Sequence, residues 1–193
     1  MKIGLYFGSF NPVHIGHMAV ANYMVEYTDL QEVWFVVSPQ NPGKDKASLL
    51  DEYQRLELVF RAINDDARFR ATDVEFRMPT PSYTIDTLAY LREQHPKHKF
   101  VLIMGSDVFA TLHKWKNAQV IADNYEILVY PRNGELAVPP LNHLKYKEIN
   151  APKMEVSSSM IRNAIAEGKN IRFFIPFHAW QYLDEMNFYK IPK

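Results

Sequence analysis

Two histidines three residues apart are the side chains with the clearest chemical potential in this sequence. His14 and His17 lie in the segment of residues 8–17, GSFNPVHIGH. Their imidazoles can donate hydrogen bonds to phosphate oxygens and stabilise negative charge that develops during a transfer reaction. Gly8 and Gly16 leave room for a phosphate to approach the backbone. The spacing favours phosphate binding over two alternatives: ordinary surface histidines, and a metal pair, which has no cysteine or acidic third ligand beside it.

The same segment stands at a junction that favours anion binding. It follows a predicted strand of residues 2–7 and opens a helix on which Met18, Ala21 and Val25 fall at helical spacing. The unpaired N–H groups at the start of a helix, together with the helix dipole, attract a phosphate. The segment is neither a GxxxxGK(S/T) loop nor a GxGxxG fingerprint, so neither of those nucleotide-binding patterns applies.

A second candidate segment is residues 156–162, VSSSMIR. Serines at a helix start cap free backbone N–H groups. Arg162, one turn later, is either a solvated charge or a charge-assisted ligand of a phosphate. Taken alone, this segment favours the structural interpretation, because such caps are common.

The elements around these segments alternate between strands and helices. Further strands are predicted at residues 33–37, 69–76, 100–104 and 126–130. Helices are predicted around Leu56, Val59, Phe60 and Ile63; around Ile85, Leu88 and Ala89; around Ile161, Ala164 and Ile165, closed by Gly168; and around Trp180 and Leu183, after Pro176. Continuous apolar strands between helices indicate a parallel sheet covered on both faces. We therefore predict a Rossmann-like, doubly wound α/β fold in a single domain of residues 1–193, with ligands beyond the carboxyl ends of the strands.

The composition excludes several classes of protein. Hydrophobic residues make up 47% of the 193 residues, which is too many for a disordered chain. Lysine plus arginine and aspartate plus glutamate number 22 each, so a nucleic-acid partner is not expected. The chain has no cysteine, which excludes disulfides and thiolate chemistry. Because no segment has the apolar length of a signal peptide or a membrane span, we expect a cytoplasmic protein without a membrane partner.

The segment of residues 8–17 closely resembles the (T/H)xGH signature of the nucleotidyltransferases related to the class I aminoacyl-tRNA synthetases. Its first glycine, Asn11 with Pro12, and both histidines match that signature in order, directly after the first strand. Residues 156–162 resemble the ISSTxIR motif with which the same superfamily holds the triphosphate of ATP. The resemblance places the following residues on the ATP phosphates: His14, His17, Ser158 and Arg162.

Three further segments resemble bacterial nicotinate-nucleotide adenylyltransferases. Residues 80–88 (TPSYTIDTL) are similar to the PSYTxDTL segment of that family, residues 102–107 (LIMGSD) to its buried strand and Gly-x-Asp turn, and residues 112–115 (LHKW) to its LxxW element. The likeness extends from residue 2 to residue 183. It implies adenylyl transfer from ATP to nicotinate mononucleotide, with Mg²⁺ accompanying ATP and no dedicated metal site on the protein.

The resemblance implies a role for each matching residue. The catalytic set is His14, His17, Lys44 and Arg162. The ATP-binding set is Gly8, Ser9, Phe10, Gly16, Gly105, Asp107, Arg132, Ser157 and Ser158. The acceptor-binding set is Tyr83, Thr84 and Trp115, with backbone N–H groups near Thr84 receiving the nicotinate carboxylate. An indole face suits a flat, electron-poor ring, and such stacking contributes about 1–3 kcal/mol.

Two departures from the family pattern and several alternatives stay open at this point. The chain has Pro42, Gly43 and Lys44 where relatives often have Pro-His-Lys, and Lys46 is an alternative to Lys44 as a phosphate ligand. Asn11 stands where many relatives have aspartate. Pantetheine-phosphate adenylyltransferase, nicotinamide mononucleotide adenylyltransferase and a non-catalytic nucleotide-binding module are the alternative functions. The acid or amide preference is open, as is the formation of a homo-oligomer.

Other aromatic and histidine residues favour plain structural interpretations. We expect His95 and His98 in a solvated turn and His178 in a packed or half-buried position. The aromatic residues near the C-terminus are expected in the core, namely Phe173, Phe174, Phe177 and Tyr182.

Overall fold

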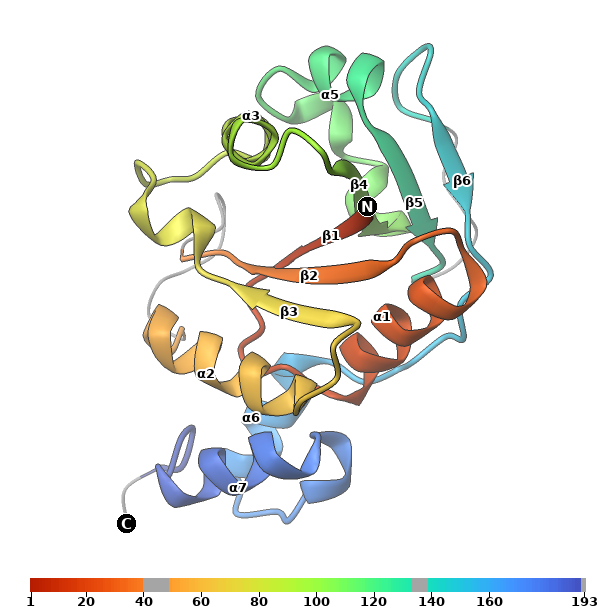
Figure 1. Cartoon of the computed structure of the whole chain (residues 1–193). Helices are drawn as coiled ribbons and strands as arrows, with labels where there is room; N and C mark the ends of the chain where they lie inside the picture. Colours follow the sequence, from red (N-terminus) through yellow and green to blue (C-terminus); the bar gives the residue numbers. More distant parts are fainter. Residues whose placement is uncertain (40–48, 133–138, 192–193) are drawn as a thin grey trace.

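A computed structural model describes residues 1–39, 49–132 and 139–191. The described residues form one six-stranded parallel sheet with the strand order β3-β2-β1-β4-β5-β6 (Figure 1). The strands are β1 (Lys2–Gly8), β2 (Glu32–Val37), β3 (Phe69–Thr72), β4 (Lys99–Gly105), β5 (Glu126–Tyr130) and β6 (Tyr146–Glu148). Strand order reverses between β1 and β4, so the carboxyl ends of these two strands define the switch point at which doubly wound folds bind ligands. The predicted Rossmann-like fold class is confirmed.

Helices cover both faces of the sheet (Figure 1). One face carries α1 (Ile15–Tyr27), α2 (Glu52–Ile63), α6 (Ser158–Ala166) and α7 (Phe177–Glu185). The other face carries α3 (Thr84–Gln94), α4 (Ser106–Phe109) and α5 (Ala118–Asn124). Short 3₁₀ turns complete the described elements: η2 (Val74–Arg77), η3 (Leu112–Lys114) and η4 (Arg172–Phe174). Within the described ranges, no helix is long and apolar enough to cross a membrane.

Alternate residues of each central strand enter two separate hydrophobic clusters. In β2, Val33 and Phe35 pack with the α1 side, whereas Trp34 and Val36 pack with the α3 side. Successive side chains of a strand point to opposite faces. Because both faces are buried, both sets must be apolar, which explains the continuous apolar runs in the sequence.

Two predictions about local structure are wrong: the end of the third strand and the buried face of α2. The strand predicted at residues 69–76 ends at Thr72, and the 3₁₀ turn η2 follows it. Phe60, predicted to face the core, is 64% exposed. The buried face of α2 contains Arg55, Leu58, Val59 and Ala62 instead. This face has the expected helical spacing but includes a charged residue, which hydrophobic periodicity does not detect.

The predicted environments of three C-terminal aromatics and of three histidines also need correction, whereas Tyr182 packs against the core as expected. Phe173, Phe174, Phe177 and His178 are exposed. Ala179 and Leu183 form the buried face of α7, so these larger side chains, in η4 and the first turn, point outward. His95 and His98 are half-buried rather than solvated, because both rings pack edge-on against Trp34, at centroid distances of 5.3 and 6.3 Å.

Candidate active site

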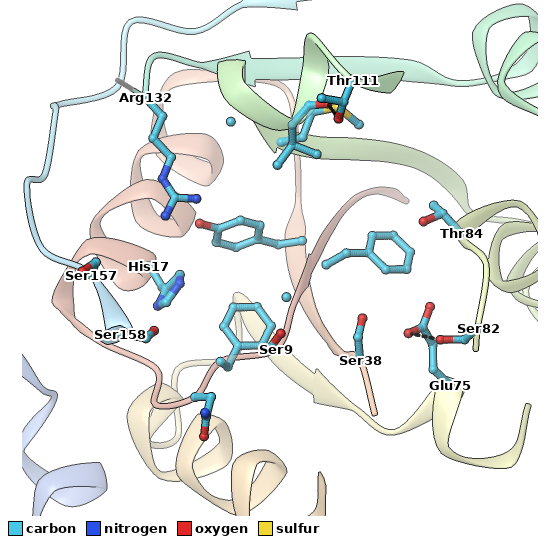
Figure 2. A pocket seen from close by; sticks show the side chains of 18 of the residues that line it. Ser9, His17, Ser38, Glu75, Ser82, Thr84, Thr111, Arg132, Ser157 and Ser158 are labelled. Carbon is cyan, nitrogen blue, oxygen red and sulfur yellow. Dashed lines mark hydrogen bonds between the residues drawn. The ribbon is translucent and has the colours of Figure 1, made fainter. Parts of the chain in front are cut away.

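A cleft of about 980 Å³ lies beyond the carboxyl ends of β1, β4 and β5. The loop between β1 and α1 and the start of α6 border one end (Figure 2). The start of α3, the segment around Trp115 and the buried Glu75 border the other end. Segments far apart in the sequence therefore meet at the position that the fold class predicts for a ligand.

Residues 8–17 are called the first motif below. Its two histidines stack on each other beside α1. Their ring centroids are 3.7 Å apart, with planes inclined by 27°. The backbone N–H of His14 donates a hydrogen bond to Nδ1 of His17 at 3.2 Å. This bond requires an unprotonated Nδ1, so the neutral ring of His17 has its proton on Nε2. The bond therefore fixes the orientation of the His17 ring beside that of His14.

His14 is held in its neutral form by its surroundings. It is only 5% exposed, and burial, together with the charge of Arg132, lowers its pKa from 6.5 to about 4. Its Nδ1 is buried and has no hydrogen-bond partner among the described residues. Because buried polar atoms are normally satisfied, this atom is a candidate for contact with a ligand or a water molecule.

The two glycines of the first motif make room for protein side chains. A Cβ atom on Gly16 would lie 2.8 Å from Cγ1 of Val156, just before α6, and 3.1 Å from the ring of His14. A Cβ atom on Gly8 would lie 2.8 Å from the ring of Phe10. Phe10 lines the cleft but is only 2% exposed, and its ring packs edge-on against His17. The glycines thus permit the close packing that brings α6 to the first motif.

The second motif, residues 156–162, contacts the first motif directly. Ser157 caps α6 by accepting a hydrogen bond from the N–H of Met160 at 3.2 Å. Ser158 donates its hydroxyl to the carbonyl of Pro12 at 2.9 Å. Arg162 donates to the carbonyl of Asn11 at 2.8 Å. The structure therefore brings together His14, His17, Ser158 and Arg162 from two segments that are more than 140 residues apart.

The turn after β4 forms a third wall of the cleft. Arg132, which follows β5, lies 3.7 Å from the carboxylate of Asp107. Ser106 donates its hydroxyl to the carbonyl of Arg132 at 2.7 Å and accepts the N–H of Arg132 at 2.9 Å. Gly105 precedes this turn, and a Cβ there would lie 2.6 Å from Oδ1 of Asp107. Ser106 had no role in the sequence analysis, although a serine directly after a buried strand is a usable signal.

The opposite end of the cleft contains the predicted acceptor residues. Tyr83 precedes the first turn of α3 and is 39% exposed, and Thr84 begins that helix. Trp115 is half-buried against the cluster on the α3 side, which agrees with its charged neighbours in the sequence. Lys116 lies over the ring of Tyr83, with 4.8 Å between Nζ and the ring centroid, and pairs with Asp86 at 2.8 Å.

Glu75 is a buried carboxylate that sequence analysis did not identify. It is 2% exposed and accepts a hydrogen bond from the hydroxyl of Ser82 at 2.9 Å (Figure 2). It also accepts the hydroxyl of Thr87 at 2.8 Å. These bonds fix the segment that leads into α3. An acidic residue followed by hydroxyl residues a few positions downstream is the sequence signal for such a group. The 3₁₀ turn η2, which directs the Glu75 side chain inward, is visible only in the structure.

The predicted lysine ligand of the phosphates lies outside the described residues. Lys44, predicted as catalytic, and its alternative Lys46 belong to residues 40–48, which are not described. Among the described residues, no group of three histidine, cysteine, aspartate or glutamate side chains could hold a metal ion.

A parallel sheet with a glycine- and histidine-containing loop at its switch point, and a serine-arginine helix start docked on that loop, is an architecture found in nucleotide-binding α/β proteins. The model of the cytidylyltransferase-like family matches residues 5–164. The chain belongs to this family and, within it, to the nicotinate-nucleotide adenylyltransferases, as its curated relatives show.

These relatives match along nearly their whole length. The chain is 50% identical over 192 residues to a probable nicotinate-nucleotide adenylyltransferase of Flavobacterium johnsoniae, covering 98% of this chain and 100% of the relative. It is 44% identical over 189 residues to a protein of the same name from Bacteroides thetaiotaomicron, covering 96% and 92%.

Solved structures show the same fold. The nicotinic acid mononucleotide adenylyltransferase of Plasmodium falciparum, complexed with NaAD, superposes with a TM-score of 0.81 at 23% identity, covering 97% of each chain. A putative nicotinate-nucleotide adenylyltransferase from Vibrio parahaemolyticus gives a TM-score of 0.73 at 21% identity, covering 99% of this chain and 96% of that one.

Proposed function

We propose that this protein transfers the adenylyl group of ATP to nicotinate mononucleotide, giving nicotinate adenine dinucleotide and pyrophosphate. One observation carries the proposal: the two phosphate motifs meet at one end of a cleft whose other end presents an indole, a phenol and a helix start. His17 and Arg162 stand at the first end, and Tyr83 and Trp115 at the second. A dinucleotide product has its phosphates between two nucleosides, and this arrangement suits that shape.

The reaction requires alignment and charge stabilisation rather than a base. A phosphate oxygen of the acceptor is already anionic at neutral pH. It attacks the α-phosphorus of ATP, a new P–O bond forms, and the bond to the bridging oxygen breaks with the electron pair leaving on pyrophosphate. The imidazoles of His14 and His17 donate hydrogen bonds to phosphate oxygens, and the guanidinium of Arg162 offsets their charge. No covalent enzyme intermediate is needed.

The remaining predicted ATP residues line or support the same end. Ser158 and the start of α6 face the triphosphate, while Gly105, Asp107 and Arg132 form the wall that we assign to the adenosine. The donors at this end are N–H, O–H and guanidinium groups, which suit phosphate oxygens rather than a cation. Mg²⁺ therefore fits as a partner held mainly by the triphosphate, where it neutralises negative charge when bound.

The acceptor end suits a pyridine ring that bears a carboxylate. The N–H groups of Asp86 and Thr87 bond to the carbonyl of Tyr83, whereas those of Thr84 and Ile85 at the helix start have no backbone partner in the described part of the chain, and we assign them to a ligand. The positive end of the helix dipole and the nearby Lys116 add favourable charge. Trp115 offers its face to the ring. We therefore expect preference for the acid over the amide.

A pyrophosphate-release assay with three acceptors tests this function. The purified protein is supplied with Mg²⁺ and ATP, together with nicotinate mononucleotide, nicotinamide mononucleotide or phosphopantetheine. We expect the fastest release with nicotinate mononucleotide. Faster turnover of the amide would transfer the assignment to the nicotinamide enzyme, and turnover of phosphopantetheine alone to the pantetheine enzyme. Silence with all three would favour a non-catalytic nucleotide-binding module.

A further inference from the structure

Arg55 of α2 is a fully buried cation whose described partners are all neutral. Its side chain has 0% exposure and makes no ion pair within the described ranges. Its guanidinium donates to four backbone carbonyls: those of Ser9 and Ser38 at 2.7 Å each, that of Leu50 at 2.9 Å and that of Pro39 at 3.0 Å. Nothing in the sequence analysis or in the relatives' names assigns it a role.

The carbonyls that Arg55 binds belong to the wall of the cleft. Ser9 follows β1 at the start of the first motif, and Ser38 follows β2. Both residues line the cleft (Figure 2), and the N–H of Ser38 donates to the carbonyl of Gly8 at 2.9 Å. The hydroxyl of Ser9 is itself buried without a partner among the described residues. Arg55 thus connects two strand ends through their backbones and leaves the hydroxyl of Ser9 available to a ligand.

A second set of bonds holds the other side of the same loop. The side-chain oxygen of Asn11 accepts the N–H of Leu50 at 3.2 Å and the hydroxyl of Tyr189 at 2.6 Å, and its backbone carbonyl accepts Arg162. The start of the first motif therefore lies between two arginines. Arg55 fixes it from the interior, and Arg162 fixes it from the side of α6.

The physical cost of this arrangement argues against a purely stabilising role. Burying a cation costs several kcal/mol unless good partners offset it, and well-packed apolar residues often stabilise a core equally well. Burial accordingly lowers the pKa of Arg55. What an apolar residue or a lysine cannot provide is a rigid fork of donors that reaches four carbonyls in fixed directions. The free-energy cost of burying Arg55 therefore falls at the loop after β1, whose geometry matters for the proposed reaction.

We propose that Arg55 is a positioning residue for adenylyl transfer: it fixes the backbones of Ser9 and Ser38 so that the loop carrying His14 and His17 keeps its place against ATP. This inference rests on the proposed function. Arg55 acts through the loop and touches no substrate. Because a displacement of about 1 Å can reduce a rate by about 100-fold, loss of even part of the fork has a measurable effect.

The test is the variant Arg55→Lys, which keeps the charge and loses the fork. We expect a folded protein whose kcat falls by about 10-fold or more and whose dissociation constant for ATP alone rises, while that for nicotinate mononucleotide changes by less than about 3-fold. The matched control is Arg61→Lys on the same helix. Arg61 is partly exposed and pairs with Glu57 at 2.6 Å, so this variant is expected to keep wild-type kinetics.

The outcomes separate positioning from stability. Thermal unfolding is followed for each variant, and activity is measured well below the midpoint. An Arg55→Lys protein with a lowered melting temperature but unchanged kcat and ATP affinity would overturn the proposal. If that variant does not fold, Arg55→Gln, which avoids a buried unpaired charge, is measured in the same way. Failure of both variants to fold would assign Arg55 to stability alone, and silence of the wild-type protein would instead contradict the proposed function.

Discussion

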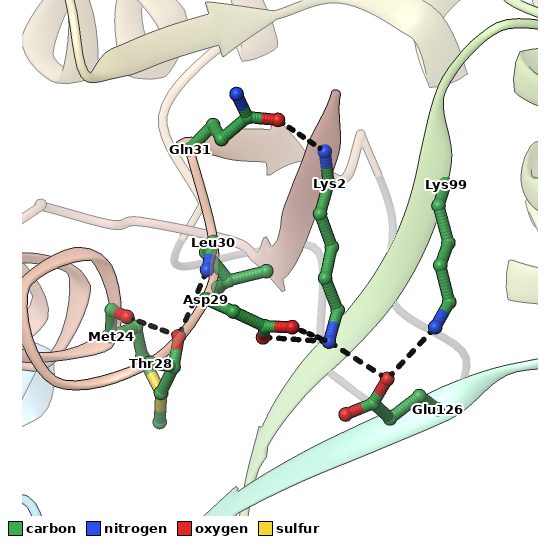
Figure 3. A network of polar contacts seen from close by, with 8 residues as sticks. All are labelled: Lys2, Met24, Thr28, Asp29, Leu30, Gln31, Lys99 and Glu126. Atoms are coloured by element: carbon green, nitrogen blue, oxygen red, sulfur yellow. Dashed lines mark hydrogen bonds and ion pairs between the residues drawn. The ribbon is translucent and has the colours of Figure 1, made fainter.

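At the amino edge of the sheet, lysines pair with carboxylates, whereas at the carboxyl edge the two arginines that hold the loop after β1 bind backbone carbonyls instead. Lys2 lies 2.7 Å from Asp29 and 2.9 Å from Glu126, and Lys99 lies 3.3 Å from the same glutamate (Figure 3). Gln31 accepts the backbone N–H of Lys2 at 2.9 Å. Both lysines thus meet carboxylates that other elements supply.

The carboxyl edge uses its polar groups differently. Arg55 and Arg162 donate to backbone carbonyls, and the Ser9 hydroxyl and Nδ1 of His14 are buried without described partners. One buried nitrogen without a described partner, Nδ1 of His98, also lies near the amino edge, but its ring packs edge-on against Trp34 and Phe100 rather than lining the cleft. The polar groups of the amino edge are therefore satisfied by each other, whereas the carboxyl edge keeps buried polar atoms without described partners beside the cleft that we propose for the phosphates.

Removing the imidazole of His17 is the strongest way to disturb the carboxyl edge. For His17→Ala we expect kcat to fall by about 100-fold or more, because one preorganised donor to a developing charge contributes that much. Pyrophosphate release measures the rate, and circular dichroism checks the fold. The control is His178→Ala, since His178 is exposed on α7. A near-normal rate for His17→Ala would remove this histidine from catalysis.

The acceptor end of the cleft can be separated from the phosphate end. Trp115→Ala is expected to weaken binding of nicotinate mononucleotide by about 1–3 kcal/mol, the contribution of one stacked base, and to change ATP binding far less. Calorimetric titration of each ligand alone measures both affinities, and Trp115→Phe serves as the matched control that keeps a flat ring. Equal losses for the two ligands would contradict an acceptor role.

His14 links the carboxyl edge to the pH dependence of stability. Its pKa falls from 6.5 when unfolded to about 4 when folded. The unfolded chain therefore binds the proton more readily between these values, and the folded protein loses stability as the pH falls from 6.5 toward 4. The loss amounts to about 1.4 kcal/mol per pH unit for this group.

Urea unfolding measured across this pH range, in the wild-type protein and in His14→Gln, provides the check. The variant should lose less stability on acidification than the wild-type protein, by about 2 kcal/mol at a pH near 5. An identical dependence in both proteins would show that His14 is not held neutral by burial.

The smallest effect is expected at the amino edge. Lys2→Met removes both ion pairs of Lys2 and should lower the free energy of unfolding by about 1 kcal/mol or less, since exposed ion pairs contribute little. Because this edge lies at the opposite ends of the strands, kcat and both ligand affinities should stay at wild-type values. A clear change in kcat would show that the two edges are coupled.

Sequence reasoning located most of the sheet and both phosphate motifs because these depend on short-range patterns. The strand predicted at residues 126–130 has the observed bounds of β5, and the helix predicted around Ile85, Leu88 and Ala89 is α3. The pattern did not detect β6, which has only three residues, or the short helices α4 and α5. Few apolar positions carry the periodic signal in elements of that length.

By itself, the sequence determined which strands are buried on both faces and which two segments resemble phosphate-binding motifs. Parallel-sheet geometry then requires the loops after the strands to share one edge. Only the tertiary structure decided that Arg55 faces inward while Phe60 faces solvent, and that Glu75 and Ser106 fix cleft walls. The partners of these polar groups include backbone carbonyls and hydroxyls on other elements. No local pattern encodes such contacts, because folding alone brings donor and acceptor together.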